Sequence, residues 1–195
     1  MESNKKLYNT ILRNKLFKNH QPYNGIQYNK SNTLNCSSVL VIIHFTQNIP
    51  TILLTKRSIF LKNHAGEISF PGGRYSSDDK SFLDTAIRET FEETGLTIHK
   101  RHVIGYLNPT YTYTSKVLIY PFVALKDRIP DRMQPNCEVE KIINISLDKL
   151  KESVFTDFYN STKNLPMFKF IVDGYLIWGA TARILKDLID KLISL

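Results

Sequence analysis

Residues 72–96, GGRYSSDDKSFLDTAIRETFEETGL, combine a glycine-rich turn with a predicted helix that ends at Gly95. The helix carries Glu89, Glu92 and Glu93, which share one face because they stand at positions i, i+3 and i+4. The apolar residues on roughly the opposite face are Leu83, Ile87 and Phe91. We therefore expect a helix with one buried side and one acidic side.

The acidic side is poorly placed for stability. Like charges at i and i+4 cost roughly 0.2–0.5 kcal/mol per pair, and anions near a helix C-terminus oppose the helix dipole. A helix turn that combines like-charge repulsion with anions at its C-terminal end is typical of a functional site, where stability is given up for function. Three hard oxygen donors suit Mg²⁺ or Mn²⁺. The three glutamates alone leave a second interpretation open, which is a solvated charged face.

Composition and charge bound the class of protein. With 195 residues and 42% hydrophobic content, the chain predicts a single domain over residues 1–195. No apolar run approaches the roughly 20 residues of a membrane span. Cys36 and Cys137 have no metal-ligand spacing and predict reduced thiols, so we expect a cytoplasmic protein. Residues 1–66 alone carry the whole net charge of +8 and could face an anionic substrate, a nucleic acid or a membrane surface.

The order of elements predicts an α/β architecture, a mixed β-sheet sandwiched between α-helices. Residues 1–38 are expected to form a basic helix and loop, and residues 39–195 the core. A loop is predicted over residues 127–136, a hairpin turn at Asp173-Gly174 and a closing amphipathic helix after Gly179. Pro121 is expected to confine its strand to an edge or a bulge. The predicted strands are residues 39–45, 51–56, 96–98, 103–107, 117–125, 139–145, 168–172 and 175–178.

The helix region resembles the Nudix box, a glycine followed at fixed spacing by Arg-Glu, Glu-Glu and a final glycine. The matching residues are Gly73, Arg88, Glu89, Glu92, Glu93, Gly95 and Leu96. The departures are Asp79 as the acid, Thr90 at an aliphatic position and one extra residue between Asp79 and Arg88. The resemblance implies the Nudix fold and a pyrophosphohydrolase.

A second motif precedes the helix. Residues 53–73, LLTKRSIFLKNHAGEISFPGG, resemble the element that marks the coenzyme A pyrophosphatase branch of the Nudix hydrolases, with Lys62 where the pattern has arginine. Residues 136–139 (NCEV) and 177–182 (IWGATA) also resemble this branch. The resemblance implies hydrolysis of coenzyme A or its thioesters to 4′-phosphopantetheine, or its acyl form, and adenosine 3′,5′-bisphosphate. It also implies Mg²⁺ or Mn²⁺ as the cofactor.

The resemblance also implies a functional role for each of the candidate site residues. Glu89, Glu92 and Glu93 are the expected metal ligands. Either Glu89 or Glu138 is the candidate general base, and Arg88 is expected to orient a carboxylate, Glu89 or Asp79, rather than contact substrate. The candidate substrate-binding residues are Lys56, Arg57, Lys62, His64 and Gly73. Lys56, Arg57 and Lys62 have an alternative interpretation as solvated surface charges. The alternative interpretation of His64 is a structural residue.

Three functions remain after this assignment. The first is hydrolysis of coenzyme A, with Arg57 as the candidate reader of its ribose 3′-phosphate. The second is hydrolysis of another Nudix substrate, such as ADP-ribose, a dinucleotide or a nucleoside triphosphate. The third, nucleic-acid binding through the basic residues 1–66, is disfavoured because a relic site has no reason to keep three destabilising acids. The expected partner is a small molecule, and no oligomeric state is indicated.

Overall fold

The computed structural model describes residue 6 and residues 10–14, 35–113, 115–155, 158–159 and 166–193. Along these segments, besides a helical stretch at residues 10–14, the helices are α2 (Phe82–Thr94), α3 (Leu147–Glu152) and α4 (Gly179–Ile193), with a 3₁₀ turn at Lys100–His102. The strands are β1 (Cys36–Thr46), β2 (Ile49–Arg57), β3 (Ile68–Ser69), β4 (Gly72–Arg74), β5 (Val103–Tyr106), β6 (Thr110–Tyr111), β7 (Leu118–Leu125), β8 (Val139–Ser146), β9 (Val154–Phe155), β10 (Phe158–Tyr159), β11 (Pro166–Met167), β12 (Lys169–Val172) and β13 (Tyr175–Trp178).

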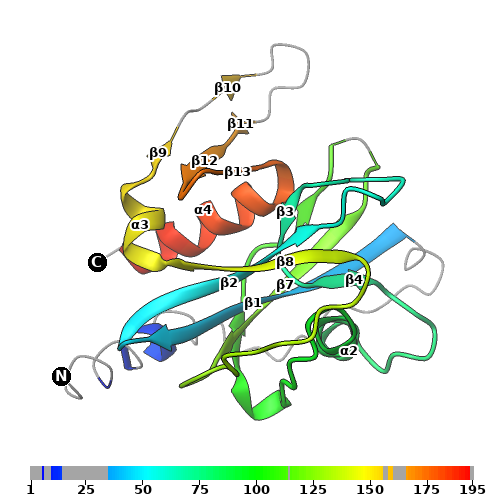
Figure 1. Cartoon of the computed structure of the whole chain (residues 1–195), viewed down its shortest axis with the longest axis horizontal. Coiled ribbons are helices and arrows are strands. Elements are labelled where there is room, and N and C mark those ends of the chain that lie inside the picture. Colours follow the sequence, from blue (N-terminus) through cyan, green and yellow to red (C-terminus); the bar gives the residue numbers. More distant parts are fainter. Residues whose placement is uncertain are drawn as a thin grey trace.

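Eight of the described strands form one mixed sheet. Its central order is β3-β2-β1-β7-β5, and β4, β6 and β8 pair with β1, β7 and β2. Strands β1 and β7 run parallel, whereas β1 and β2 run antiparallel. Helix α2 covers one face of the sheet, and α3 and α4 cover the other (Figure 1). The predicted mixed α/β sheet between helices is confirmed.

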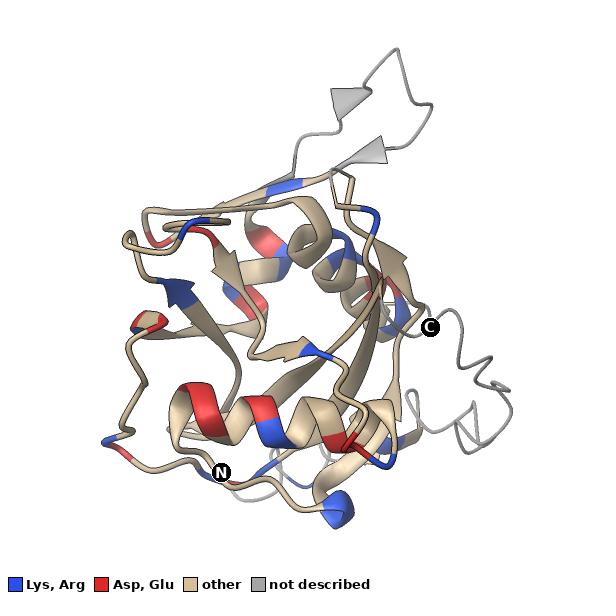
Figure 2. Ribbon diagram, turned by 90° about the vertical axis from the view of Figure 1, so that its right-hand side faces the viewer, with Lys and Arg blue, Asp and Glu red and all other residues tan. Residues whose placement is uncertain are grey.

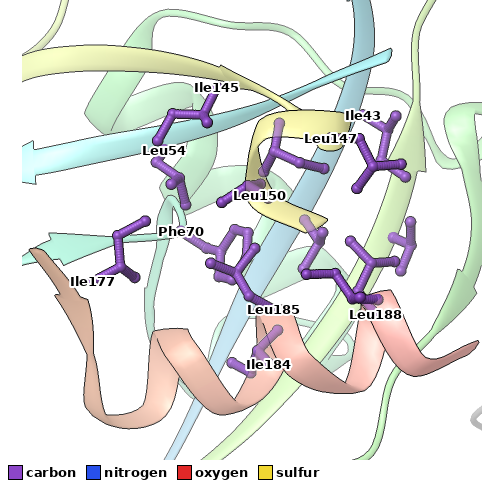
Figure 3. Close-up of a cluster of buried hydrophobic side chains, with 14 of the residues drawn as sticks. Ile43, Leu54, Phe70, Ile145, Leu147, Leu150, Ile177, Ile184, Leu185 and Leu188 are labelled. Atoms are coloured by element: carbon purple, nitrogen blue, oxygen red, sulfur yellow. The ribbon is translucent and has the colours of Figure 1, made fainter. Parts of the chain in front are cut away.

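The two faces of the sheet have separate cores because successive residues of a strand point to opposite faces. Val41 and Ile43 of β1 belong to the same buried cluster as Leu185 and Leu188 of α4. Figure 3 shows Ile43, Leu185 and Leu188 within this cluster. Their neighbours in β1 are buried on the other face against Phe82 and Ala86 of α2. Strand β1, buried along most of its length, therefore anchors both helices.

Pro121 was predicted to confine its strand to an edge or a bulge, and it lies in an interior strand whose pairing with β5 shifts register between Val103 and Gly105. Strand β7 pairs with β1 on one side and with β5 and β6 on the other. Proline has no N–H to donate. On the side of β5 and β6 the pairing is interrupted between Tyr106 and Thr110, and Pro121 contributes its carbonyl there to the N–H of Leu107 at 2.9 Å. The gap between two short strands accommodates the missing donor.

Other predicted elements are confirmed or shifted by a few residues. Strand β1 begins at Cys36, three residues earlier than predicted, and residues 96–98 are buried in part but form no strand. The hairpin at Asp173-Gly174 is confirmed, with φ angles of 49° and 78°. Residues 10–14 are helical and Leu12 is buried, while the remainder of the predicted N-terminal helix lies outside the described residues. None of the described helices has the length and apolar character needed to cross a membrane.

Candidate active site

Helix α2 begins and ends at residues that satisfy its terminal backbone groups. The hydroxyl of Ser81 accepts a hydrogen bond from the N–H of Asp84 at 3.2 Å. At the other end Gly95 adopts a φ of 70°, and its N–H donates to the carbonyl of Phe91 at 2.8 Å. The predicted stop at Gly95 is confirmed. These two caps fix the length of the helix and thus the position of its glutamates.

The buried face of α2 differs from the predicted one. Phe91, expected in the core, is 55% exposed, while Glu93, expected on the outer face, is 4% exposed. Leu83 and Ile87 are partly buried at the flank of the core. The buried residues of the helix are Phe82, Thr85, Ala86, Thr90, Glu93 and Thr94. The reason is that β4 packs on the glutamate-bearing half of the helix, so its polar residues are covered.

Arg88 binds three carboxylates, those of its two expected partners Asp79 and Glu89 and that of Glu92. Its Nε and Nη2 donate to the two oxygens of Asp79, each at 2.9 Å. Its Nη1 donates to Glu89 at 2.8 Å and to Glu92 at 3.1 Å. The bidentate bond to Arg88 is the main reason that the pKa of the nearly buried Asp79 lies below its usual value. Asp79, which stood out of register in the box, is therefore a structural anchor.

Glu93 is a buried carboxylate at the meeting point of β2, β4 and β8. One oxygen accepts the N–H of Gly72 at 3.0 Å, and the other lies 3.7 Å from Nη1 of Arg57. Burial raises the pKa of Glu93 to about 7, an effect that the Gly72 N–H and Arg57 oppose and that nearby Glu89 and Glu138 reinforce. The charged form of Glu93 is thus disfavoured in the folded protein, even with Arg57 beside it.

Gly73 makes room for a second carboxylate. A Cβ atom at this position would lie 2.3 Å from Cδ of Glu89. Burial raises the pKa of Glu89, against the opposing effect of its bond to Arg88. Gly73 was assigned to substrate binding from the sequence, and the geometry adds a second role, which is to let Glu89 lie flat against β4.

Gly73→Ala is expected to reduce turnover about tenfold or more while changing the melting temperature little, because a flexible glutamate can move away from the new methyl group. The matched control is Gly72→Ala, whose Cβ would lie 2.2 Å from the backbone oxygen of Ser38 at a φ of 148°. That control should lower stability strongly. Steady-state rates and thermal melts distinguish the two, and normal turnover in Gly73→Ala would contradict the role of Gly73.

The cluster carries more negative than positive charge. Five carboxylates, those of Asp79, Glu89, Glu92, Glu93 and Glu138, surround two guanidinium groups, and Figure 2 shows the acidic positions along α2. Within the described residues, no three acidic, histidine or cysteine side chains converge on one point that could hold a metal ion. Arg88 draws Glu89 and Glu92 to one side, and Gly72 holds Glu93 on the other. The donor chemistry fits a divalent cation once these side chains turn together.

Arg57, the last residue of β2, and Glu138, in the turn just before β8, join this cluster. Nη2 of Arg57 lies 3.8 Å from Glu138, so the guanidinium stands between Glu138 and Glu93. Glu138 is half-exposed, and its backbone carbonyl accepts the N–H of Ser58 at 2.8 Å. Asn136, which the sequence matched but did not assign, receives the backbone N–H of Glu138 on Oδ1 at 3.0 Å. Gly72 and Arg57 of the motif at residues 53–73 thus lie in one cluster with Glu93 of the helix.

The remaining predicted substrate-binding residues lie outside this cluster. Lys56 is engaged in an ion pair with Glu140 at 2.6 Å. Lys62 is exposed on the loop between β2 and β3. His64 closes that loop through a bond of 3.0 Å from Nδ1 to Glu67, which favours its structural interpretation.

Comparisons with known proteins show which family the chain resembles. The model of the NUDIX domain matches residues 35–164. The mitochondrial coenzyme A diphosphatase NUDT8 of Mus musculus is 35% identical over 81% of this chain and 78% of its own length. A protein named uncharacterized Nudix hydrolase NudL, from Yersinia enterocolitica, is 31% identical over 73% of this chain and 74% of its own length.

A solved structure shows the same fold at low sequence identity. The MutT/nudix family protein from Enterococcus faecalis superposes with a TM-score of 0.61 at 13% identity, and the match covers 82% of this chain and 62% of that one. This similarity shows the fold, and the domain match and the two relatives show the family. The chain belongs to the Nudix hydrolase family.

Proposed function

We propose that this protein hydrolyses the pyrophosphate bond of coenzyme A or its thioesters, giving 4′-phosphopantetheine, or its acyl form, and adenosine 3′,5′-bisphosphate. The observation that carries the proposal is that Glu93 of the Nudix box is held by Gly72 and Arg57 of the second motif. That motif is the part of the sequence that resembles the coenzyme A branch. The similarity to a mouse coenzyme A diphosphatase supports the same substrate.

Glu89, Glu92 and Glu93 are the residues that would hold Mg²⁺ or Mn²⁺. The excess negative charge of the cluster and the raised pKa of Glu93 support a bound cation. When bound, such a cation polarises phosphoryl oxygens and lowers the pKa of a coordinated water. Arg88 keeps Glu89 and Glu92 oriented, while Arg57 contributes positive charge where charge develops on the phosphoryl oxygens.

Glu138 is the better candidate for the general base of the two considered. It is half-exposed and stands 3.8 Å from Arg57, whereas Glu89 is held by Arg88 at 2.8 Å. A carboxylate that accepts a proton from water needs access to solvent and a free oxygen. We assign proton removal from the attacking water to Glu138.

Glu138→Gln is expected to lower kcat about 10²- to 10⁴-fold with little change in KM, since it removes a group that acts in the transition state. Glu140→Gln, two residues along β8, is the matched control and should keep its rate. Initial rates over a range of coenzyme A concentrations provide both constants. An effect confined to KM would move Glu138 to a substrate-positioning role.

The position of Arg57 changes the expectation for its substrate contact. Because its guanidinium lies between Glu93 and Glu138, it faces the pyrophosphate rather than the 3′-phosphate. A charge-assisted hydrogen bond is worth about 1.5–3 kcal/mol, so Arg57→Ala should lose roughly 10- to 150-fold in kcat/KM. The loss should be equal on coenzyme A and on dephospho-coenzyme A.

Lys62 then becomes the candidate reader of the 3′-phosphate. Lys62→Ala should reduce kcat/KM on coenzyme A and leave dephospho-coenzyme A unchanged. The two variants are compared on the two substrates in one experiment. A selective loss in Arg57→Ala would restore the original assignment of Arg57 to the 3′-phosphate.

The proposed function is tested by one assay with Mg²⁺ that compares coenzyme A, hexanoyl-coenzyme A, ADP-ribose and nucleoside triphosphates. We expect kcat/KM to be highest for the coenzyme A compounds, with adenosine 3′,5′-bisphosphate among the products. Faster hydrolysis of ADP-ribose or of a triphosphate would replace the proposal by the second Nudix function considered from the sequence.

A further inference from the structure

The hairpin of β12 and β13 buries one of its faces and exposes the other. Phe170 and Ile177 stand opposite each other in register and belong to the buried cluster that α4 shares. Figure 3 shows Ile177 within that cluster. Because successive residues of a strand point to opposite faces, Ile171, Leu176 and Trp178 lie on the outer face. In Figure 1 this hairpin lies on the side of the molecule away from α2.

The outer face carries apolar side chains where polar ones are the rule. Ile171 is 61% exposed, Leu176 49% and Trp178 42%. Ile171 stands directly opposite Leu176, and Trp178 is two residues further along the same strand, so the three side chains are neighbours. A sheet with one solvated face normally alternates apolar and polar residues. A contiguous apolar patch on the solvent side instead indicates an interaction surface. We call these three residues the outer patch.

The surroundings of the outer patch are basic. Lys169 stands opposite Trp178 and therefore lies on the same face. Lys141 of β8 lies beside the start of β13, where its Nζ donates to the hydroxyl of Tyr175 at 3.0 Å. Asp173, the only acid of residues 168–178, is paired with Lys149 at 2.7 Å. Three lysines against one aspartate leave a net positive charge around the patch.

A second copy of this chain is a poor match for the outer patch. The three partly exposed side chains offer roughly 300 Å² together, because even a whole aromatic side chain buries only about 150–250 Å². A stable interface covers about 800 Å² on each partner. Two copies that met at their patches would also bring their lysines together, and like charges oppose association. Size and charge thus both argue against self-association through this patch.

An anionic lipid surface matches both the size and the charge of the outer patch. A protein that lies on a membrane inserts a few apolar side chains at the boundary between headgroups and acyl chains, and it needs no large complementary surface. Tryptophan is enriched at that boundary. Lysines near the membrane are attracted to anionic headgroups. The composition of the patch and its border, with Trp178 next to Lys169, has both features.

We propose that the outer patch docks on anionic lipid surfaces. Its three apolar side chains insert among the headgroups, and Lys169 and Lys141 lie against the lipid phosphates. In this orientation α2 and its glutamates lie on the side of the molecule away from the lipid. Lipid docking is therefore a property separate from hydrolysis, and it does not depend on the proposed substrate.

Trp178 reports on docking directly because it is the only tryptophan of the chain. The full chain is mixed with vesicles of phosphatidylcholine and phosphatidylglycerol in equal parts, and separately with vesicles of phosphatidylcholine alone. With the anionic vesicles we expect a blue shift of the tryptophan emission and sedimentation of the protein with the lipid, both weakened by high salt. Binding to the neutral vesicles should be at least about tenfold weaker.

The variant that tests the patch combines Ile171→Thr with Leu176→Thr. It should bind the anionic vesicles about tenfold more weakly or worse, because it removes apolar surface while threonine preserves the strand. Ile49→Thr is the matched control, since Ile49 is 46% exposed on β2 and lies outside the patch. The control should bind as the wild type does. Thermal melts of both variants should match that of the wild type.

Three results would overturn this inference. The first is a wild type whose tryptophan emission is unchanged by the anionic vesicles. The second is binding that survives in the double variant, or that falls equally in Ile49→Thr, because the patch is then not the docking surface. The third is a wild type that is dimeric without lipid, by sedimentation equilibrium, and a double variant that is monomeric, because a second copy then covers the patch.

Discussion

Glu93→Gln is expected to reduce turnover at least about a hundredfold while making the metal-free protein more stable at pH 8. Turnover falls because the substitution removes a charged oxygen that the cation requires. Stability rises because Glu93 is buried and its charged form is disfavoured in the folded protein. A purely structural glutamate would show the opposite change in stability.

The pH dependence of this effect has a definite sign. The pKa of Glu93 is raised from 4.5 to about 7 in the folded protein, so the folded state binds the proton more tightly than the unfolded state. Ionised Glu93 therefore destabilises the fold increasingly between pH 4.5 and 7, by roughly 3 kcal/mol at most above pH 7. Below pH 4.5 the carboxyl is protonated in both states, and the substitution should have no such effect.

Urea unfolding of the metal-free protein at pH 4 and pH 8 measures this difference. Glu92→Gln is the matched control, since Glu92 is half-exposed on the same helix and should not show the stabilisation at pH 8. A Glu93→Gln protein that is no more stable than the wild type at pH 8 would contradict the cost assigned to its buried charge. Near-normal turnover would remove Glu93 from the metal site.

Arg88→Ala is expected to lower the free energy of unfolding by about 3 kcal/mol. The substitution leaves the carboxylate of Asp79 buried, with only Thr85 and the N–H of Ser76 as partners. The figure is at the low end for a broken buried pair because the Arg88 side chain is 34% exposed. Turnover should also fall, since Glu89 and Glu92 lose the group that orients them.

A double-mutant cycle checks the mechanism of this loss. Asp79→Asn combined with Arg88→Ala should cost much less than the sum of the two single changes, because the buried charge is then absent. Lys100→Ala, which breaks an exposed pair with Asp84 on the same helix, is the control and should cost no more than about 1 kcal/mol. Additive costs in the cycle would show that Arg88 does not act through Asp79.

The motifs of the sequence predicted the family, the sheet between helices and the helix bearing the glutamates. The pairing of Arg88 with Asp79 and Glu89 also matches its two candidate partners. The predictions about the glutamates and Arg88 depend on local spacing along the chain. They concern interactions within or next to one helix, where the separation of residues in the sequence determines their geometry.

Three features could not be read from local spacing. The apolar periodicity of α2 predicted a buried Phe91, but β4 covers the opposite side and buries Glu93 instead. The interior position of Pro121 depends on a gap between β5 and β6, which lie elsewhere in the sequence. The place of Arg57 between Glu93 and Glu138 follows from strand pairing of β2 with β8. In each case tertiary packing overrides the local pattern.

The claim that the glutamates of α2 hold a divalent cation is tested most directly by titration with Mn²⁺, followed by the loss of the free-ion electron paramagnetic resonance signal. The wild type should bind Mn²⁺ and bind it more tightly as pH rises through 7, because the cation displaces the proton of Glu93. Glu93→Gln should lose this binding, while Glu140→Gln should retain it. Equal binding of Mn²⁺ by the wild type and Glu93→Gln would contradict the assignment.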